Sequence, residues 1–70
     1  MYTEVKIDFY DDIEGCWSVD AWKTEDPNEE GRVVAKIYDD TSVVWTVPDA
    51  KTDPLVTESI SQFLQEEYNI

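Results

Sequence analysis

Residues 4–10 read EVKIDFY, the strict alternation of apolar and polar side chains that is typical of a half-buried β-strand. Val5, Ile7 and Phe9 are predicted to face a core, and the even positions through Tyr10 face the other side of the strand. Residues 11–15, DDIEG, then supply turn-forming side chains. This stretch therefore predicts a strand that ends in a tight turn.

The same alternation recurs three times along the chain. We expect further strands over residues 17–22, 33–38 and 43–47, separated by a polar loop at 25–31 and a turn at 39–42. Short connections between consecutive strands favour an antiparallel meander. The predicted core positions are all odd-numbered: Val5, Ile7, Phe9, Trp17, Val19, Ala21, Val33, Ala35, Ile37, Val43, Trp45 and Val47.

A helix is predicted after the strands. Asp53 followed by Pro54 is a typical helix start, because Asp accepts N–H bonds of the first turn and Pro fits the first helical position. Apolar residues then recur at helical spacing: Leu55, Val56, Ile60, Phe63, Leu64 and Tyr68. The predicted fold class is α+β: a four-stranded antiparallel meander (β-β-β-β-α) with one C-terminal helix packed on one face, forming a single domain over residues 1–70.

The composition is strongly acidic, with 17 Asp plus Glu, 5 Lys plus Arg, no His and a formal net charge of -12. Its 41% hydrophobic content, with three Trp, four Tyr and two Phe, nevertheless favours folding over disorder. A domain of this size buries only about 60% of its unfolded surface and is marginally stable alone. One Cys excludes an intrachain disulfide, and the absence of His excludes a His/Cys zinc site. We therefore expect self-association, as a homodimer.

The sheet face opposite the helix is the predicted interface. One helix covers one face only, and the other face is expected to carry apolar and aromatic side chains among charged ones: Tyr10, Trp22, Val34, Tyr38 and Val44. Such a group either stabilises an exposed sheet through cross-strand pairs or binds a protein. We favour binding, to a second copy or to another protein whose identity the sequence does not give.

Negative charge is expected to gather at one end of the meander, where two turns and the helix C-terminus meet. The candidates are Asp11, Asp12, Glu14, Asp39, Asp40, Glu66 and Glu67. Three interpretations remain open: solubility, a carboxylate site for a divalent cation, and mimicry of nucleic-acid phosphates. An EF-hand fails, because Gly15 as its sixth residue puts Tyr10 at position one and Ala21 at position twelve. No metal ligand set is predicted.

Two resemblances concern nucleic acids. The chain is similar in size and charge to small acidic inhibitors of DNA- or RNA-handling enzymes, which implies a mimic of nucleic acid. The order β-β-β-β-α resembles small single-stranded-DNA-binding coactivator domains, but topology does not carry function. Those domains need a basic sheet, so we expect no direct nucleic-acid binding here.

Catalytic chemistry is not predicted. The chain lacks His, and its two glycines, Gly15 and Gly31, allow neither a P-loop nor a dinucleotide-binding turn. Cys16 follows Glu14 closely, which disfavours a thiolate and favours a structural thiol. Asp8 and Asp20 alternate onto one sheet face, where two carboxylates more often form a solvated surface than an acid–base pair. We expect a cytoplasmic, non-catalytic interaction module with no cofactor, no leader peptide and no membrane span.

Overall fold

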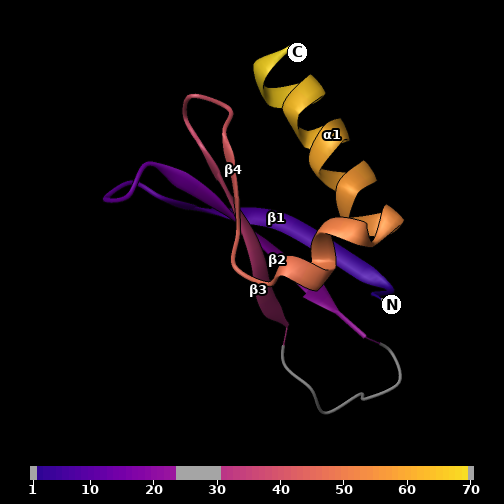
Figure 1. Ribbon diagram of the computed structural model, residues 1–70. Helices are drawn as coiled ribbons and strands as arrows, with labels where there is room; N and C mark the ends of the chain where they lie inside the picture. Colours follow the sequence, from indigo (N-terminus) through magenta and orange to yellow (C-terminus); the bar gives the residue numbers. More distant parts are fainter. Residues whose placement is uncertain (1, 24–30, 70) are drawn as a thin grey trace.

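The computed structural model describes residues 2–23 and 31–69 and confirms the α+β meander. Its four strands form one antiparallel sheet in the order β1-β2-β3-β4, followed by a short 3₁₀ helix and a C-terminal α-helix (Figure 1). The elements are β1 (Glu4–Asp11), β2 (Cys16–Trp22), β3 (Arg32–Tyr38), β4 (Val43–Trp45), η1 (Pro48–Thr52) and α1 (Pro54–Tyr68). The predicted loop 25–31 lies outside the described residues except for Gly31.

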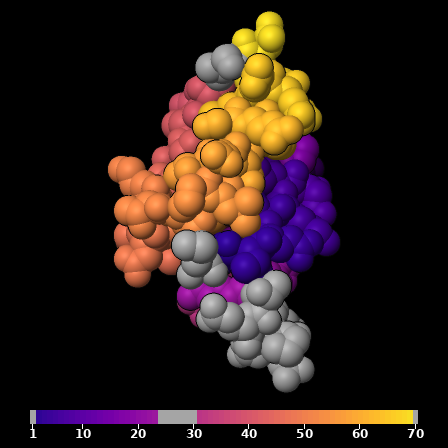
Figure 2. Space-filling view, turned by 90° about the vertical axis from the view of Figure 1, so that its right-hand side faces the viewer, coloured from indigo at the N-terminus to yellow at the C-terminus, as the bar shows by residue number. Residues whose placement is uncertain are grey.

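The helix covers one face of the sheet, as predicted. Figure 2 views the molecule from the side of α1, with β1 in indigo on one flank of the helix and the β3–β4 region on the other. The buried core joins Val19, Ala35 and Ile37 of the sheet to Val56 and Ile60 of α1. Phe63 and Leu64 pack against this core and stay partly exposed, whereas Leu55, predicted to lie in the apolar stripe, is 36% exposed.

Asp53 fastens the start of α1 to the start of the sheet. Its carboxylate accepts the backbone N–H of Leu55 at 3.0 Å and of Val56 at 3.4 Å, and Pro54 occupies the first helical position, as the sequence predicts. The other carboxylate oxygen accepts the N–H of Tyr2 at 2.8 Å. One buried side chain therefore joins two segments that lie 51 residues apart.

A β-bulge in β1 reverses the predicted alternation. Lys6 pairs with Asp20 and Phe9 with Ser18, so Ile7 and Asp8 together oppose the single residue Val19. Side chains after the bulge change faces. Phe9, predicted to be core, is 60% exposed, and Tyr10, predicted for the open face, instead packs on Trp17 with ring centroids 5.1 Å apart.

A second bulge does the same in β3. Val19 pairs with Ala35 and Asp20 with Val33, which leaves Val34 as the extra residue. Val34 is completely buried in the core, whereas Val33 is 38% exposed. The predictions for these two residues were therefore wrong, and Val34 is not available as an interface residue.

The fourth strand is shorter than predicted, ending at Trp45 instead of residue 47. The backbone N–H groups of Thr46 and Val47 both donate to the carbonyl of Val34, at 3.0 and 3.1 Å, so the bulge in β3 fixes where β4 leaves the ladder. Pro48 then begins η1, which the sequence analysis missed and which buries Ala50.

The bulge in β3 predicts a sharp contrast between two neighbouring valines. Val34→Ala removes two buried methyl groups and is expected to lower the free energy of unfolding by about 2 kcal/mol or more. Val33→Ala, the matched control, is expected to change the stability of the monomeric chain by less than about 0.5 kcal/mol, because Val33 is 38% exposed. Urea unfolding followed by Trp fluorescence measures both. A larger effect at Val33 would contradict the register.

The Asp53 bonds predict a loss of stability on truncation. Asp53→Ala removes the helix cap and leaves the Tyr2 N–H without this acceptor, so we expect the free energy of unfolding to fall by about 1–2 kcal/mol. Asp49→Ala removes an exposed carboxylate from η1 and is expected to cost less than about 0.5 kcal/mol. Equal costs would show that the cap contributes nothing specific.

The same comparison has a defined pH dependence. The hydrogen bond from the Tyr2 N–H lowers the pKa of Asp53 below its usual 3.8. Burial acts in the opposite direction, and the N–H groups of the helix start lower the pKa further. The stabilisation is therefore complete above pH 3.8 and is lost as the pH falls through the lower folded-state pKa. The difference in the free energy of unfolding between wild type and Asp53→Ala should therefore shrink as the pH falls below 3.8. A difference that stays constant with pH would contradict the role given to the Asp53 carboxylate.

Candidate interaction surface

The sheet face away from α1 carries a different apolar set from the one predicted. The bulges remove Tyr10 and Val34 from this open face and place Phe9 and Val33 on it, beside the predicted Trp22, Tyr38 and Val44. Phe9 is 60% exposed and Val44 48% exposed, while Trp22 and Tyr38 are half-buried. Sequence reasoning missed Phe9 and Val33 because each bulge shifts the alternation by one residue.

One cross-strand row runs over the whole width of the open face. Phe9 pairs with Ser18, Ser18 with Lys36, and Lys36 with Val44. Exposed apolar side chains therefore lie at the two ends of the row, on the edge strands, with polar side chains between them.

Two lysines, Lys6 and Lys36, lie on the same face. The Lys36 amine lies 2.9 Å from a Glu14 carboxylate oxygen, and this hydrogen bond raises the pKa of Lys36. The Lys6 amine lies 3.8 Å from Glu4 and 5.6 Å from the centroid of the Trp22 ring. Two of the five cationic side chains thus lie among the acidic groups of this face.

Trp22 also has a structural role. Its ring lies against Gly31, where a Cβ atom would clash with the indole.

On the neighbouring row, burial and then the charge of Asp8 raise the pKa of Asp20. The two carboxylates that the sequence analysis placed on one face therefore do interact electrostatically.

Tyr10 belongs to an aromatic cluster under α1. Trp17 packs between Tyr10 and Phe63, with ring centroids 5.1 and 5.2 Å away in tilted and edge-on arrangements, and the Phe63 and Tyr68 centroids lie 6.3 Å apart. The Tyr10 hydroxyl donates to the two carboxylate oxygens of Asp39 at 3.0 and 2.9 Å, a hydrogen bond that raises the pKa of Tyr10. This predicted contact residue instead helps to hold the helix and the β3–β4 turn together.

The two acidic turns meet at one end of the sheet, where the Asp39 N–H donates to the Gly15 carbonyl at 3.1 Å. Asp11 accepts the N–H groups of Ile13 at 2.9 Å and Glu14 at 3.2 Å, which closes the first turn. The Asp11 carboxylate therefore stabilises the backbone of the first turn.

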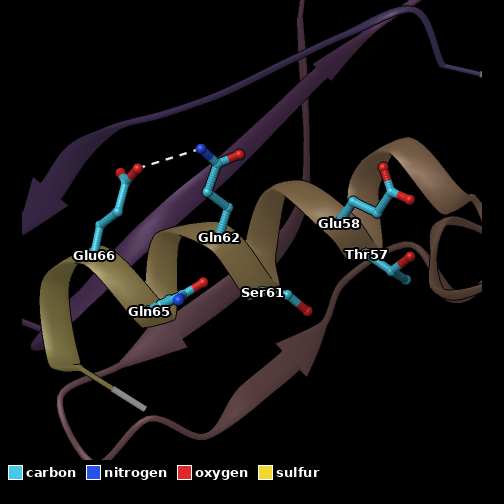
Figure 3. Close-up of a pocket in the computed structure, with 6 residues that line it drawn as sticks. All are labelled: Thr57, Glu58, Ser61, Gln62, Gln65 and Glu66. Atoms are coloured by element: carbon cyan, nitrogen blue, oxygen red, sulfur yellow. Dashed lines mark hydrogen bonds between the residues drawn. The ribbon is translucent and has the colours of Figure 1, made fainter.

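The other acidic candidates divide between bonded and exposed groups. Asp40 accepts the Ser42 hydroxyl at 2.6 Å and its N–H at 3.0 Å, and these bonds lower the pKa of Asp40. Glu66 accepts a hydrogen bond from Gln62 at 3.2 Å (Figure 3). Asp12 and Glu67 are exposed.

The structure gives the cation-binding alternative no geometric support. Within residues 2–23 and 31–69, no three His, Cys, Asp or Glu side chains are grouped so as to hold a metal ion. A hollow between the two turns is lined in part by Glu14, Asp39 and Asp40, but Glu14 is engaged by Lys36 and Asp39 by Tyr10.

Another hollow lies along the solvent side of α1. Its lining residues all belong to that helix: Thr57, Glu58, Ser61, Gln62, Gln65 and Glu66 (Figure 3). These are polar side chains on a helix surface, and they bring together no acid, base or nucleophile pair from different elements.

The comparisons give this surface no precedent: no protein-family model, no curated protein and no solved structure matches the chain. Within the described part of the chain, neither η1 nor α1 is long and apolar enough to cross a membrane.

Cys16 is expected to be an unreactive thiol. It is 1% exposed, and this burial is the main cause that raises the pKa of Cys16. The charge of Glu14, whose carboxylate oxygen lies 3.7 Å from the sulfur, raises the pKa further. Thiol titration with an aromatic disulfide at pH 8 should therefore proceed at least about 100-fold more slowly in the folded protein than in urea. Rapid labelling of the folded protein would contradict its placement.

Proposed function

We propose that this protein is a small, non-catalytic protein-interaction module that self-associates through its open sheet face. The observation that carries the proposal is the exposure of Phe9, Val33 and Val44 on a face that α1 does not cover. Removing large apolar side chains from water is favourable, by roughly 25 cal/mol per Å² of apolar surface buried. A 70-residue chain, with its small core, benefits from such burial.

Two lysines of the open face make it compatible with a second acidic copy. Two chains of net charge -12 repel each other wherever carboxylates dominate. On the open face, Lys6 and Lys36 offset neighbouring glutamates at 3.8 and 2.9 Å. These two lysines reduce the repulsion between two copies at the open face.

The order of side chains on the open face also suits a symmetric pair. A two-fold axis parallel to the strands places β1 of one copy over β4 of the other, as in aligned sheet packing. Phe9 then faces Val44 of the second copy, and Ser18 faces Lys36 of the second copy, because these residues share one row. This arrangement pairs apolar with apolar and keeps the two Lys36 amines apart.

Sedimentation equilibrium tests the proposed dimer. Phe9→Ser or Val44→Ser is expected to raise the dimer dissociation constant about 10-fold, because each removes an exposed apolar contact. Ile13→Ser is the matched control: Ile13 is 93% exposed but lies in the β1–β2 turn, and its loss should have no effect. Trp22→Ala should also weaken the dimer, although its loss uncovers Gly31 as well.

Two results would contradict self-association through this face. One is a wild-type chain that sediments as an 8.1 kDa monomer up to about 1 mM. The other is equal weakening by Ile13→Ser. Raising the salt concentration to about 0.5 M should leave the dimer intact, since apolar burial is not screened.

A nucleic-acid-mimicking inhibitor is the second candidate, favoured by the meeting of two acidic turns at one end of the sheet. A partner bound there should dissociate as salt rises and should be lost on Asp12→Asn with Glu67→Gln, which remove exposed carboxylates without breaking the turn bonds. Phe9→Ser should leave that binding unchanged, so the two functions are separable.

A further inference from the structure

A groove runs between the edge strand β1 and the helix α1. Its lining residues come from both elements: Val5, Ile7, Ser59, Gln62, Phe63 and Glu66. Figure 2 shows the two elements side by side on this surface. The groove is separate from the open face, because Val5 and Ile7 lie on the helix side of the sheet.

The floor of the groove is apolar and reachable. Val5, Ile7 and Phe63 pack against the buried core, yet each stays only half-buried. The core therefore supports these side chains from below while part of each faces the groove.

The wall formed by β1 offers backbone hydrogen bonds. Within the described sheet β1 pairs on one side only, with β2, so alternate N–H and C=O groups point away from the sheet. Pairing with β2 is regular from Glu4 to Lys6, and the bulge at Ile7 and Asp8 interrupts the strand there. The regular part of the edge can thus pair with a short added strand. The bulge disfavours pairing along the whole length of β1, as between the β1 strands of two copies.

Charge selects the occupant. Glu66 lines the groove and is held by the hydrogen bond from Gln62 at 3.2 Å; in Figure 3 both side chains project from the same side of α1. The five cationic residues of the chain all fall within the described residues, and none of them lines the groove. A segment bearing Lys or Arg is therefore attracted, while a second acidic copy is repelled.

We propose that the groove binds an extended segment of another protein, with alternating basic and apolar side chains, as an added strand beside β1. The segment's backbone pairs with the free edge near Val5, its apolar side chains contact Ile7 and Phe63, and a basic side chain reaches Glu66. Main-chain bonds supply affinity and the alternate side chains supply specificity in this mode of recognition. The proposal does not depend on dimerisation through the open face.

The test uses the full chain and a capped six-residue peptide of alternating lysine and valine. In an NMR titration we expect shifts at Val5, Ile7, Gln62 and Glu66, together with slower amide exchange in the first half of β1. Gln62→Lys places a cation in the groove without touching the core and should weaken binding roughly fivefold. Gln65→Lys makes the same change at an exposed α1 position that does not line the groove, and should weaken it less than about twofold.

Backbone pairing is tested separately from charge. The same peptide with alternate amides N-methylated keeps its charge and loses its strand-forming edge, so its binding should be at least about 10-fold weaker. Equal binding of the methylated peptide would overturn the proposal, as would equal effects of Gln62→Lys and Gln65→Lys. Shifts confined to Lys36 and Val44, no saturable binding, or shifts at Val5 that depend on protein concentration without peptide would also overturn it.

Discussion

Two extra residues in the sheet, one in β1 and one in β3, decide which side chains this fold buries. Both bulges adjoin Val19, which is completely buried at the centre of the sheet. Each reverses the inside–outside alternation of its own strand, so Tyr10 reaches the aromatic cluster under α1 and Val34 enters the core. The carbonyl of Val34 accepts the N–H groups of Thr46 and Val47, so regular pairing of β4 stops at Trp45 and the chain turns into η1. Core, strand lengths and the exposed face all depend on this local irregularity.

The acidity of the chain has more than one physical role. Carboxylates of Asp11 and Asp40 accept backbone N–H groups in turns, and Asp53 caps α1 while holding the start of β1. Such bonds make these residues part of the local fold, and they lower the pKa of Asp40 and of Asp53. Part of the net negative charge therefore comes from carboxylates that the turns and the helix start require. The net charge still repels other acidic chains.

The two proposed surfaces follow from the same architecture. Among the described elements, α1 covers one face of the sheet and leaves the other open, and the meander leaves β1 and β4 as edges. The open face combines exposed apolar side chains with two lysines, which suits a second copy. The β1–α1 groove combines an apolar floor with Glu66 and no cation, which suits a basic strand. The charges divide these two roles between opposite sides of the sheet.

The sequence by itself determined the element order, the antiparallel meander and the start of α1 at Asp53-Pro54. These features depend on local patterns: alternation, turn residues between strands, and a capping side chain before a proline. Trp22, Tyr38 and Val44 were placed correctly on the open face for the same reason. Phe9, Tyr10, Val33 and Val34 were not, because a bulge inserts one residue without a compositional signal and only pairing with β2 reveals it. The groove between β1 and α1 likewise required the tertiary structure, since it joins residues more than 50 positions apart whose proximity depends on how the helix packs across the sheet.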